Sequence, residues 1–82
     1  MLMYEKLFHI VGVLIGVPPE TLSEDSSRGK VAYWDSLKHM NIILELEEEF
    51  NVYFTDEEIS KISSIRDMIE VLINKGVPKE KL

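Results

Sequence analysis

The sequence contains 82 residues, of which 45% are hydrophobic and 29% are charged, and it has no cysteine. A chain of this length buries only about 60–65% of its unfolded surface, so we expect one small domain over residues 1–82 without a deep cleft. The missing cysteines exclude a disulfide, a thiolate zinc site and a cysteine nucleophile. Fifteen acidic residues against nine basic ones give a formal charge of −6, which disfavours nucleic acid and anionic lipid as partners.

The segment from Met1 to Val17 predicts an amphipathic helix rather than a targeting or membrane segment. Glu5, Lys6 and His9 interrupt its apolar run, which is also too short to span a bilayer. Gly16 and the prolines that follow predict the end of this helix. We therefore expect no membrane insertion and a cytoplasmic location. The apolar residues have the spacing of one helix face: Met3, Leu7, Ile10, Val11, Leu14 and Ile15.

A long connection over residues 18–33 leads to a second predicted helix over residues 36–50. Connections of this length are unusual in small domains and are often functional. Either Asp35 or Ser36 is suited to cap the helix, because both side chains accept hydrogen bonds from first-turn N–H groups. Asn51 is expected to end it. The apolar residues expected to anchor the connection are Leu22, Val31, Ala32 and Tyr33.

Two further helices are predicted after residue 54. The spacing of Thr55 and Glu58 is that of a capping box, which predicts a short helix ending near Ile62. Ser64 precedes the last helix, which Gly76 and Pro78 are expected to end. Its predicted apolar face consists of Ile65, Met68, Ile69, Leu72 and Ile73. We predict an all-α fold, a small four-helix bundle of three longer helices and one short one with a long loop between the first two.

The second predicted helix carries two apolar stripes, because successive residues lie about 100° apart around the axis. One stripe must line the core, and too few other helices exist to cover both, although a bundle that wraps both sides is an alternative. The expected core stripe consists of His39, Ile42, Ile43, Leu46 and Phe50. The predicted docking face consists of Leu37, Met40, Leu44, Glu47 and Glu48.

The charges between His39 and Ser60 support a docking surface for basic partners. This segment contains seven carboxylates and no Lys or Arg. A solvated helix face is the ordinary explanation of such a run. However, uncompensated carboxylates repel one another, and a patch retained for basic partners explains the missing lysines better. The carboxylates are those of Glu45, Glu47, Glu48, Glu49, Asp56, Glu57 and Glu58.

Trp34-Asp35-Ser36-Leu37 at a helix start, with Glu47-Glu48-Glu49-Phe50 at its end, resembles the acyl carrier protein family. The resemblance covers the chain from its first helix to Gly76. In this family a phosphopantetheinyl transferase, the holo-carrier synthase, moves 4'-phosphopantetheine from coenzyme A onto the serine of Asp-Ser-Leu. Acyl groups are then carried as thioesters on the terminal thiol of this phosphopantetheine arm. The resemblance implies that Ser36 is the attachment residue, that Asp35 helps the transferase to engage and that Leu37 contacts partners.

The resemblance also implies a monomeric carrier rather than an enzyme. Its expected partners are the transferase and acyl-loading, condensing or acyltransferase enzymes with basic docking patches, in fatty acid, polyketide or related biosynthesis. Lys38 and Asn41 stand where fatty-acid carriers usually have acidic residues, and Trp34 replaces a small residue; these departures disfavour housekeeping fatty acid synthesis. Phe54 and Ile59 are bulky for their places, which predicts a small internal pocket for an acyl chain.

Four alternatives are weighed against an acyl carrier. An aminoacyl, peptidyl or D-alanyl carrier stays open, as does an unmodified interaction module of the same fold. A serine hydrolase that uses His39 is disfavoured, since no Gly-x-Ser-x-Gly elbow exists and no third group is placed to orient the histidine. A calcium site within residues 24–29 lacks the alternating ligands of an EF-hand loop.

Overall fold

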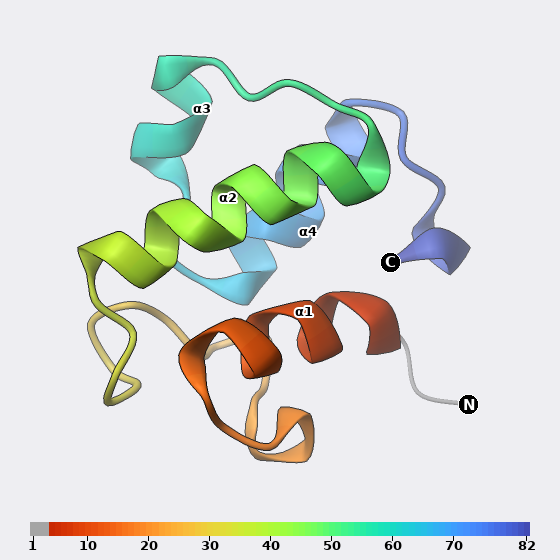
Figure 1. The fold of residues 1–82 in the computed structure, drawn as a ribbon. Helices are drawn as coiled ribbons and strands as arrows, with labels where there is room; N and C mark the ends of the chain where they lie inside the picture. Colours follow the sequence, from red (N-terminus) through yellow and green to blue (C-terminus); the bar gives the residue numbers. More distant parts are fainter. Residues whose placement is uncertain (1–3) are drawn as a thin grey trace.

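Four α-helices make up the fold in the computed structural model, which describes residues 4–82 (Figure 1). In Figure 1 the longest helix, α2, crosses the front of the molecule, α4 lies behind it and α1 runs below it. The predicted all-α bundle of three longer helices and one short helix is confirmed. The helices are α1 (Glu5–Ile15), α2 (Ser36–Phe50), α3 (Asp56–Lys61) and α4 (Ile65–Asn74), with 3-10 turns η1 (Pro19–Thr21) and η2 (Lys79–Lys81).

Side-chain caps set the starts of the last three helices where the sequence predicted them. Asp35, and not Ser36, caps α2: its Oδ1 accepts the N–H of Lys38 at 2.9 Å. Thr55 and Ser64 begin α3 and α4 with complete capping boxes. Because each box satisfies two otherwise unpaired N–H groups, it fixes the first turn at little cost.

Left-handed residues end α1 and α2, again as predicted. Gly16 has φ 79° and Asn51 has φ 52°, the conformation that glycine and asparagine adopt most readily. A second glycine in α1 has a packing role that the sequence did not reveal. A Cβ atom on Gly12 would lie 2.8 Å from the carbonyl oxygen of Val17, so the chain turns closely back over the helix.

The core lies between α2, α4 and α1, and the predicted helix faces supply it. Within the predicted face of α1, Met3 lies outside the described residues, while Ile10 and Leu14 are only half-buried. Ile73 was wrongly assigned to the core of α4: it is 38% exposed, because it lies about 100° around the axis from the buried Leu72. The fully or almost fully buried side chains on these helices include Leu7, Val11, Ile15, Ile42, Ile43, Leu46, Ile65, Met68 and Leu72.

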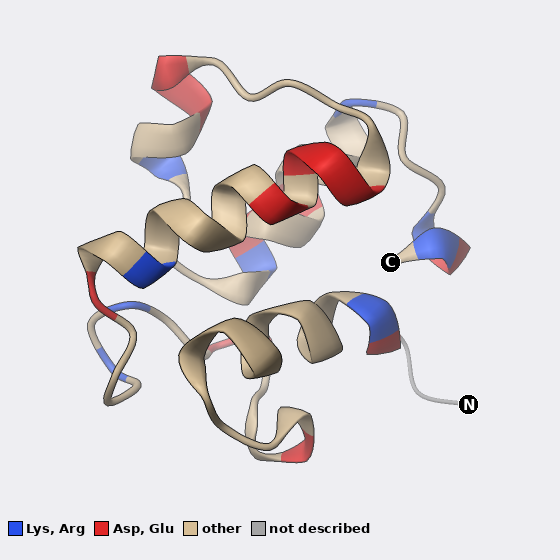
Figure 2. Ribbon diagram, viewed as in Figure 1, with Lys and Arg blue, Asp and Glu red and all other residues tan. Residues whose placement is uncertain are grey.

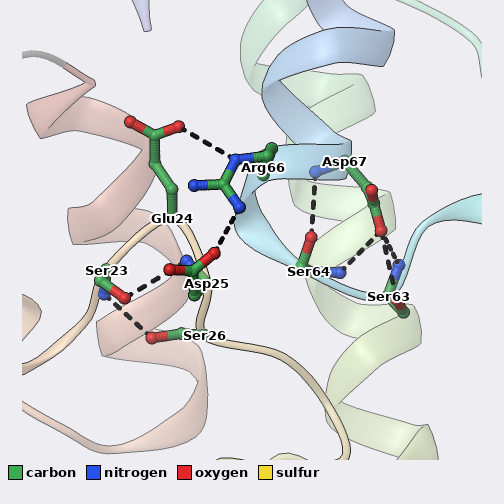
Figure 3. Close-up of polar contacts among 8 residues, drawn as sticks. All are labelled: Ser23, Glu24, Asp25, Ser26, Ser63, Ser64, Arg66 and Asp67. Carbon is green, nitrogen blue, oxygen red and sulfur yellow. Dashed lines mark hydrogen bonds and ion pairs between the residues drawn. The ribbon is translucent and has the colours of Figure 1, made fainter.

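The long connection before α2 is fastened to the start of α4 (Figure 3). The N–H of Arg66 donates to the carbonyl of Glu24 at 2.9 Å, and its guanidinium lies 3.6 Å from the Glu24 carboxylate and also pairs with Asp25. An isolated antiparallel bridge joins Ser27 to Ser64. The connection is therefore held at its middle, and only residues 28–34 separate this anchor from the α2 cap.

Two of the predicted anchors of the connection are wrong. Ala32 and Tyr33 are exposed, whereas Leu22 and Val31 are half-buried as expected. The buried anchor is Trp34, which is only 2% exposed. A large indole removes more apolar surface from water than alanine can, and the turn before it directs the neighbouring tyrosine outwards.

Candidate functional site

Ser36 is an exposed residue at the first position of the 15-residue helix α2. Because Asp35 is the cap, the Ser36 side chain is not needed to begin the helix. The Asp35 carboxylate occupies the N–H of Lys38, which leaves the amides of Ser36 and Leu37 without an intrahelical acceptor. The positive end of the helix dipole lies at the same place. An anion attached to this hydroxyl is therefore stabilised by position alone.

A buried pair of side chains, Trp34 and His39, packs beneath the first turn of α2 on its core side. The Trp34 Nε1–H donates to His39 Nδ1 at 3.0 Å, and the rings are stacked with centroids 5.9 Å apart. Since the indole nitrogen only donates, Nδ1 must accept and the ring proton lies on Nε2. Nε2 then donates to the carbonyl of Ile62 at 3.1 Å. The pair ties the residue before the cap to α2 and to the α3–α4 junction.

The environment of His39 keeps its imidazole neutral. Burial, and second the nearby positive charge of Arg28, lower the pKa of His39 below its ordinary value. Both ring nitrogens are engaged in hydrogen bonds, so neither is available to take a proton from Ser36. The predicted absence of a hydrolase site agrees with this arrangement, since a general base needs an accessible lone pair aimed at the nucleophile.

The two predicted stripes of α2 are confirmed by side-chain exposure. His39, Ile42, Ile43 and Leu46 are at most 2% exposed, and Phe50 is half-buried. On the opposite side Leu37 is 71% exposed, Met40 41% and Leu44 57%. The described helices therefore cover one stripe and leave the other open, and the wrapped-bundle alternative is wrong for this helix.

Figure 2 shows acidic residues in the second half of α2 and at the start of α3. These residues have more ion-pair partners than the sequence indicated. Three of the seven carboxylates considered uncompensated lie in ion pairs within the described residues. Glu49 lies 3.5 Å from Lys6, Glu57 3.3 Å from Lys61 and Glu58 2.7 Å from Lys75. Two of these lysines come from distant parts of the chain, so a local charge count missed them.

Glu47 and Glu48, both placed in the predicted docking face, differ in their surroundings. Glu47 is half-buried and its Oε2 accepts the backbone N–H of Phe54 at 2.9 Å, which holds the loop after α2. Glu48 is exposed, and no ion pair is found for it within residues 4–82. Sequence reasoning missed the loop contact of Glu47, because the spacing of seven residues crosses the end of the helix.

Residues 4–82 offer neither a metal-binding cluster nor a helix suited to span a membrane. This part of the chain contains no group of three or more His, Cys, Asp or Glu side chains placed to hold a metal ion. None of its helices combines the length and apolarity needed to cross a bilayer.

Comparison with known proteins gives one consistent family. A family model described as a phosphopantetheine attachment site matches residues 5–72. An acyl carrier protein of Thermosynechococcus vestitus is 35% identical over 87% of this chain and 88% of its own length. Acyl carrier proteins of Cyanidium caldarium and Chlorobium phaeobacteroides are each 32% identical over 87% of this chain, covering 83% and 91% of their own lengths. The chain therefore belongs to the acyl carrier protein family, a class of carriers rather than enzymes whose cofactor is covalently bound 4'-phosphopantetheine.

Proposed function

We propose that Ser36 carries the phosphopantetheine arm and that the chain presents acyl groups, as thioesters on that arm, to biosynthetic enzymes. The observation that carries this proposal is the exposed Ser36 hydroxyl at the first position of a long helix whose cap is a different residue. The hydroxyl is thus available for modification without loss of the helix start. The similar proteins are acyl carrier proteins, which supports acyl cargo.

The residues around Ser36 fit a phosphodiester. The arm brings a terminal thiol, which this cysteine-free chain does not itself contain. The amides of Ser36 and Leu37 and the positive end of the α2 dipole favour the negative charge of the phosphate. Asp35 keeps the first turn in place through its bond to Lys38. No base is required from this chain, because the modifying enzyme supplies the catalytic groups.

A phosphopantetheinyl transferase is the partner required for attachment. The serine Oγ forms the new bond to the β-phosphorus of coenzyme A, the P–O bond to the adenosine bisphosphate breaks, and the hydroxyl proton passes to a base of the transferase. Acyl-loading, condensing or acyltransferase enzymes are the proposed partners afterwards. The proposed docking face is the apolar stripe of α2 with its neighbouring carboxylates. Apolar contact there gives affinity, and charge gives orientation. The face consists of Leu37, Met40, Leu44, Glu47 and Glu48.

The test of this function is intact-protein mass spectrometry after incubation with coenzyme A and a broad-specificity phosphopantetheinyl transferase. We expect the wild-type chain to gain the mass of one phosphopantetheine and Ser36→Ala to gain none. Because Asp35 caps the helix, Ser36→Ala should change the free energy of unfolding by only about 0.5 kcal/mol or less. Ser60→Ala, at another exposed serine, is the matched control and should be modified as the wild type is.

Two results would contradict the proposal. Mass gain in Ser36→Ala would place the arm on another residue. A wild-type chain that gains no mass with two different transferases would instead favour an unmodified interaction module built on the same fold.

A further inference from the structure

Tyr33 combines two unfavourable properties three residues before Ser36. Its side chain is 74% exposed, and its backbone has φ 71°, in the left-handed region. Aromatic side chains adopt this region rarely, because the Cβ atom approaches the following carbonyl oxygen. Among the described residues only Tyr4 and Asn51 share a positive φ without being glycine.

The positions of Trp34 and Asp35 depend on the left-handed turn at residue 33. They do not depend on the side chain of Tyr33. The N–H of Trp34 donates to the carbonyl of Val31 at 3.3 Å, and the turn directs Trp34 into the core while Asp35 reaches the helix cap. A glycine or an asparagine at position 33 would make the same turn without the steric penalty. The exposed phenol ring therefore contributes nothing to the core that offsets its strain.

The ring of Tyr33 lies beside the side chain of Lys38, a residue of the first turn of α2. The Lys38 Nζ atom is 5.8 Å from the ring centroid, within cation–π range. Lys38 is two residues after Ser36, and within residues 4–82 its ammonium group is in no ion pair. An exposed aromatic ring three residues before Ser36 thus contacts a cation two residues after it, and the exposed Leu37 lies between Ser36 and Lys38 in the chain.

We propose that Tyr33 is a specificity-determining contact through which the carrier engages its phosphopantetheinyl transferase. Its ring enters an apolar pocket on the transferase beside the acceptor serine, and an acidic group of the transferase faces Lys38. Exposed tyrosines supply large, rigid contact area and are frequent among the residues that dominate interface energies. A strained residue retained beside a reacting group is the pattern expected when the side chain acts in binding. This inference rests on the proposed modification of Ser36.

The experiment compares the steady-state rate of phosphopantetheine transfer from coenzyme A to five carriers: wild type, Tyr33→Gly, Tyr33→Asn, Tyr33→Phe and Tyr53→Ala. Tyr53 is 76% exposed in the loop after α2 and serves as the matched control. We expect Tyr33→Gly and Tyr33→Asn to lose about tenfold in kcat/KM, mainly through KM, and Tyr33→Phe and Tyr53→Ala to stay within about twofold of wild type. Tyr33→Gly should melt at or above the wild-type temperature, because it relieves the turn.

A Tyr33→Gly variant that is at least as stable as the wild type but is modified more slowly would separate a binding role of Tyr33 from a structural role. Wild-type kcat/KM in both Tyr33→Gly and Tyr33→Asn would overturn the inference, even with Ser36 fully modified. A loss in Tyr33→Phe as large as in Tyr33→Gly would contradict contact through the ring. A loss in Tyr33→Gly that Tyr33→Asn does not share would assign the effect to chain flexibility and also overturn it. A wild-type chain that gains no phosphopantetheine would contradict the proposed function itself, and this inference with it.

Discussion

The two faces of α2 depart from the usual rule of burial in opposite directions. The inner face buries a polar residue, His39, and satisfies both of its ring nitrogens within the chain. The outer face exposes apolar residues, among them Leu37 and Leu44, and no described part of the chain covers them. A buried polar group that is fully satisfied supports one fold, whereas an exposed apolar stripe beside Ser36 is what the proposed docking face requires.

The largest expected difference between the two faces is in stability. Leu46→Ala on the inner face should lower the free energy of unfolding by about 2–5 kcal/mol, because it removes buried methyl groups and leaves a cavity. Leu44→Ala on the outer face should change it by about 0.5 kcal/mol or less. Urea unfolding followed by circular dichroism gives both values. Similar losses in the two variants would mean that the outer stripe is packed in solution.

A smaller effect should appear when the pH is lowered. The folded state holds His39 neutral with a lowered pKa, while in the unfolded chain the group titrates near its ordinary pKa of about 6.5. The unfolded state therefore binds the proton first, so stability is fully present above about pH 6.5 and falls as the pH drops towards the folded pKa, by at most about 1.4 kcal/mol per pH unit.

Urea midpoints measured between pH 7.5 and pH 5 would show this loss. His39→Gln keeps one donor and one acceptor but cannot be protonated, so its stability should depend much less on pH over this range. His9 is exposed, and His9→Gln is the control that should retain the wild-type profile. The carboxylates of Glu58 and Asp67, whose pKa values are also lowered, titrate below this range. An unchanged profile in His39→Gln would contradict the assignment.

The smallest expected effect concerns charge on the outer face. Glu48→Lys should reduce kcat/KM for the transferase by about two- to fivefold at low salt, and the difference should shrink as salt rises. Glu20→Lys in η1 makes the same change in net charge away from α2 and is the control. Equal effects of the two variants would mean that only net charge matters. Glu47 is unsuitable for this test, because its reversal also breaks the bond to Phe54.

Local patterns in the sequence were sufficient to predict the helices, whereas the candidate serine was identified through the resemblance to the acyl carrier protein family. Helix ends depend on residues within one turn, so side-chain chemistry alone determines where they fall. This holds for the caps at Thr55 and Ser64 and for the left-handed end at Asn51. The two stripes of α2 follow from helical spacing alone. The second helix was predicted to begin at Ser36, with the choice of cap left open between Asp35 and Ser36. The structure places Ser36 at the first helical position and makes Asp35 the cap.

Contacts between distant residues could not be predicted in the same way. Arg66 binds Glu24 and Asp25 across the bundle, and Lys6 compensates Glu49. Nothing in the local sequence distinguishes these basic residues from solvated ones. For Trp34 a signal was available, since a tryptophan five residues before a histidine at a helix start can meet it across the first turn. That signal became decisive only once the fold showed both rings buried.

The position of Trp34 also gives the molecule a built-in optical probe. It is the only tryptophan of the chain, it is buried, and it lies two residues before Ser36, with its indole N–H hydrogen-bonded to His39. Indole emission from this protein therefore arises at one known place, at the base of the turn that presents Tyr33 and Ser36. Because this single fluorophore shares a hydrogen bond with His39, we expect protonation of that imidazole to change its emission, which makes the change in charge visible in real time on unlabelled protein.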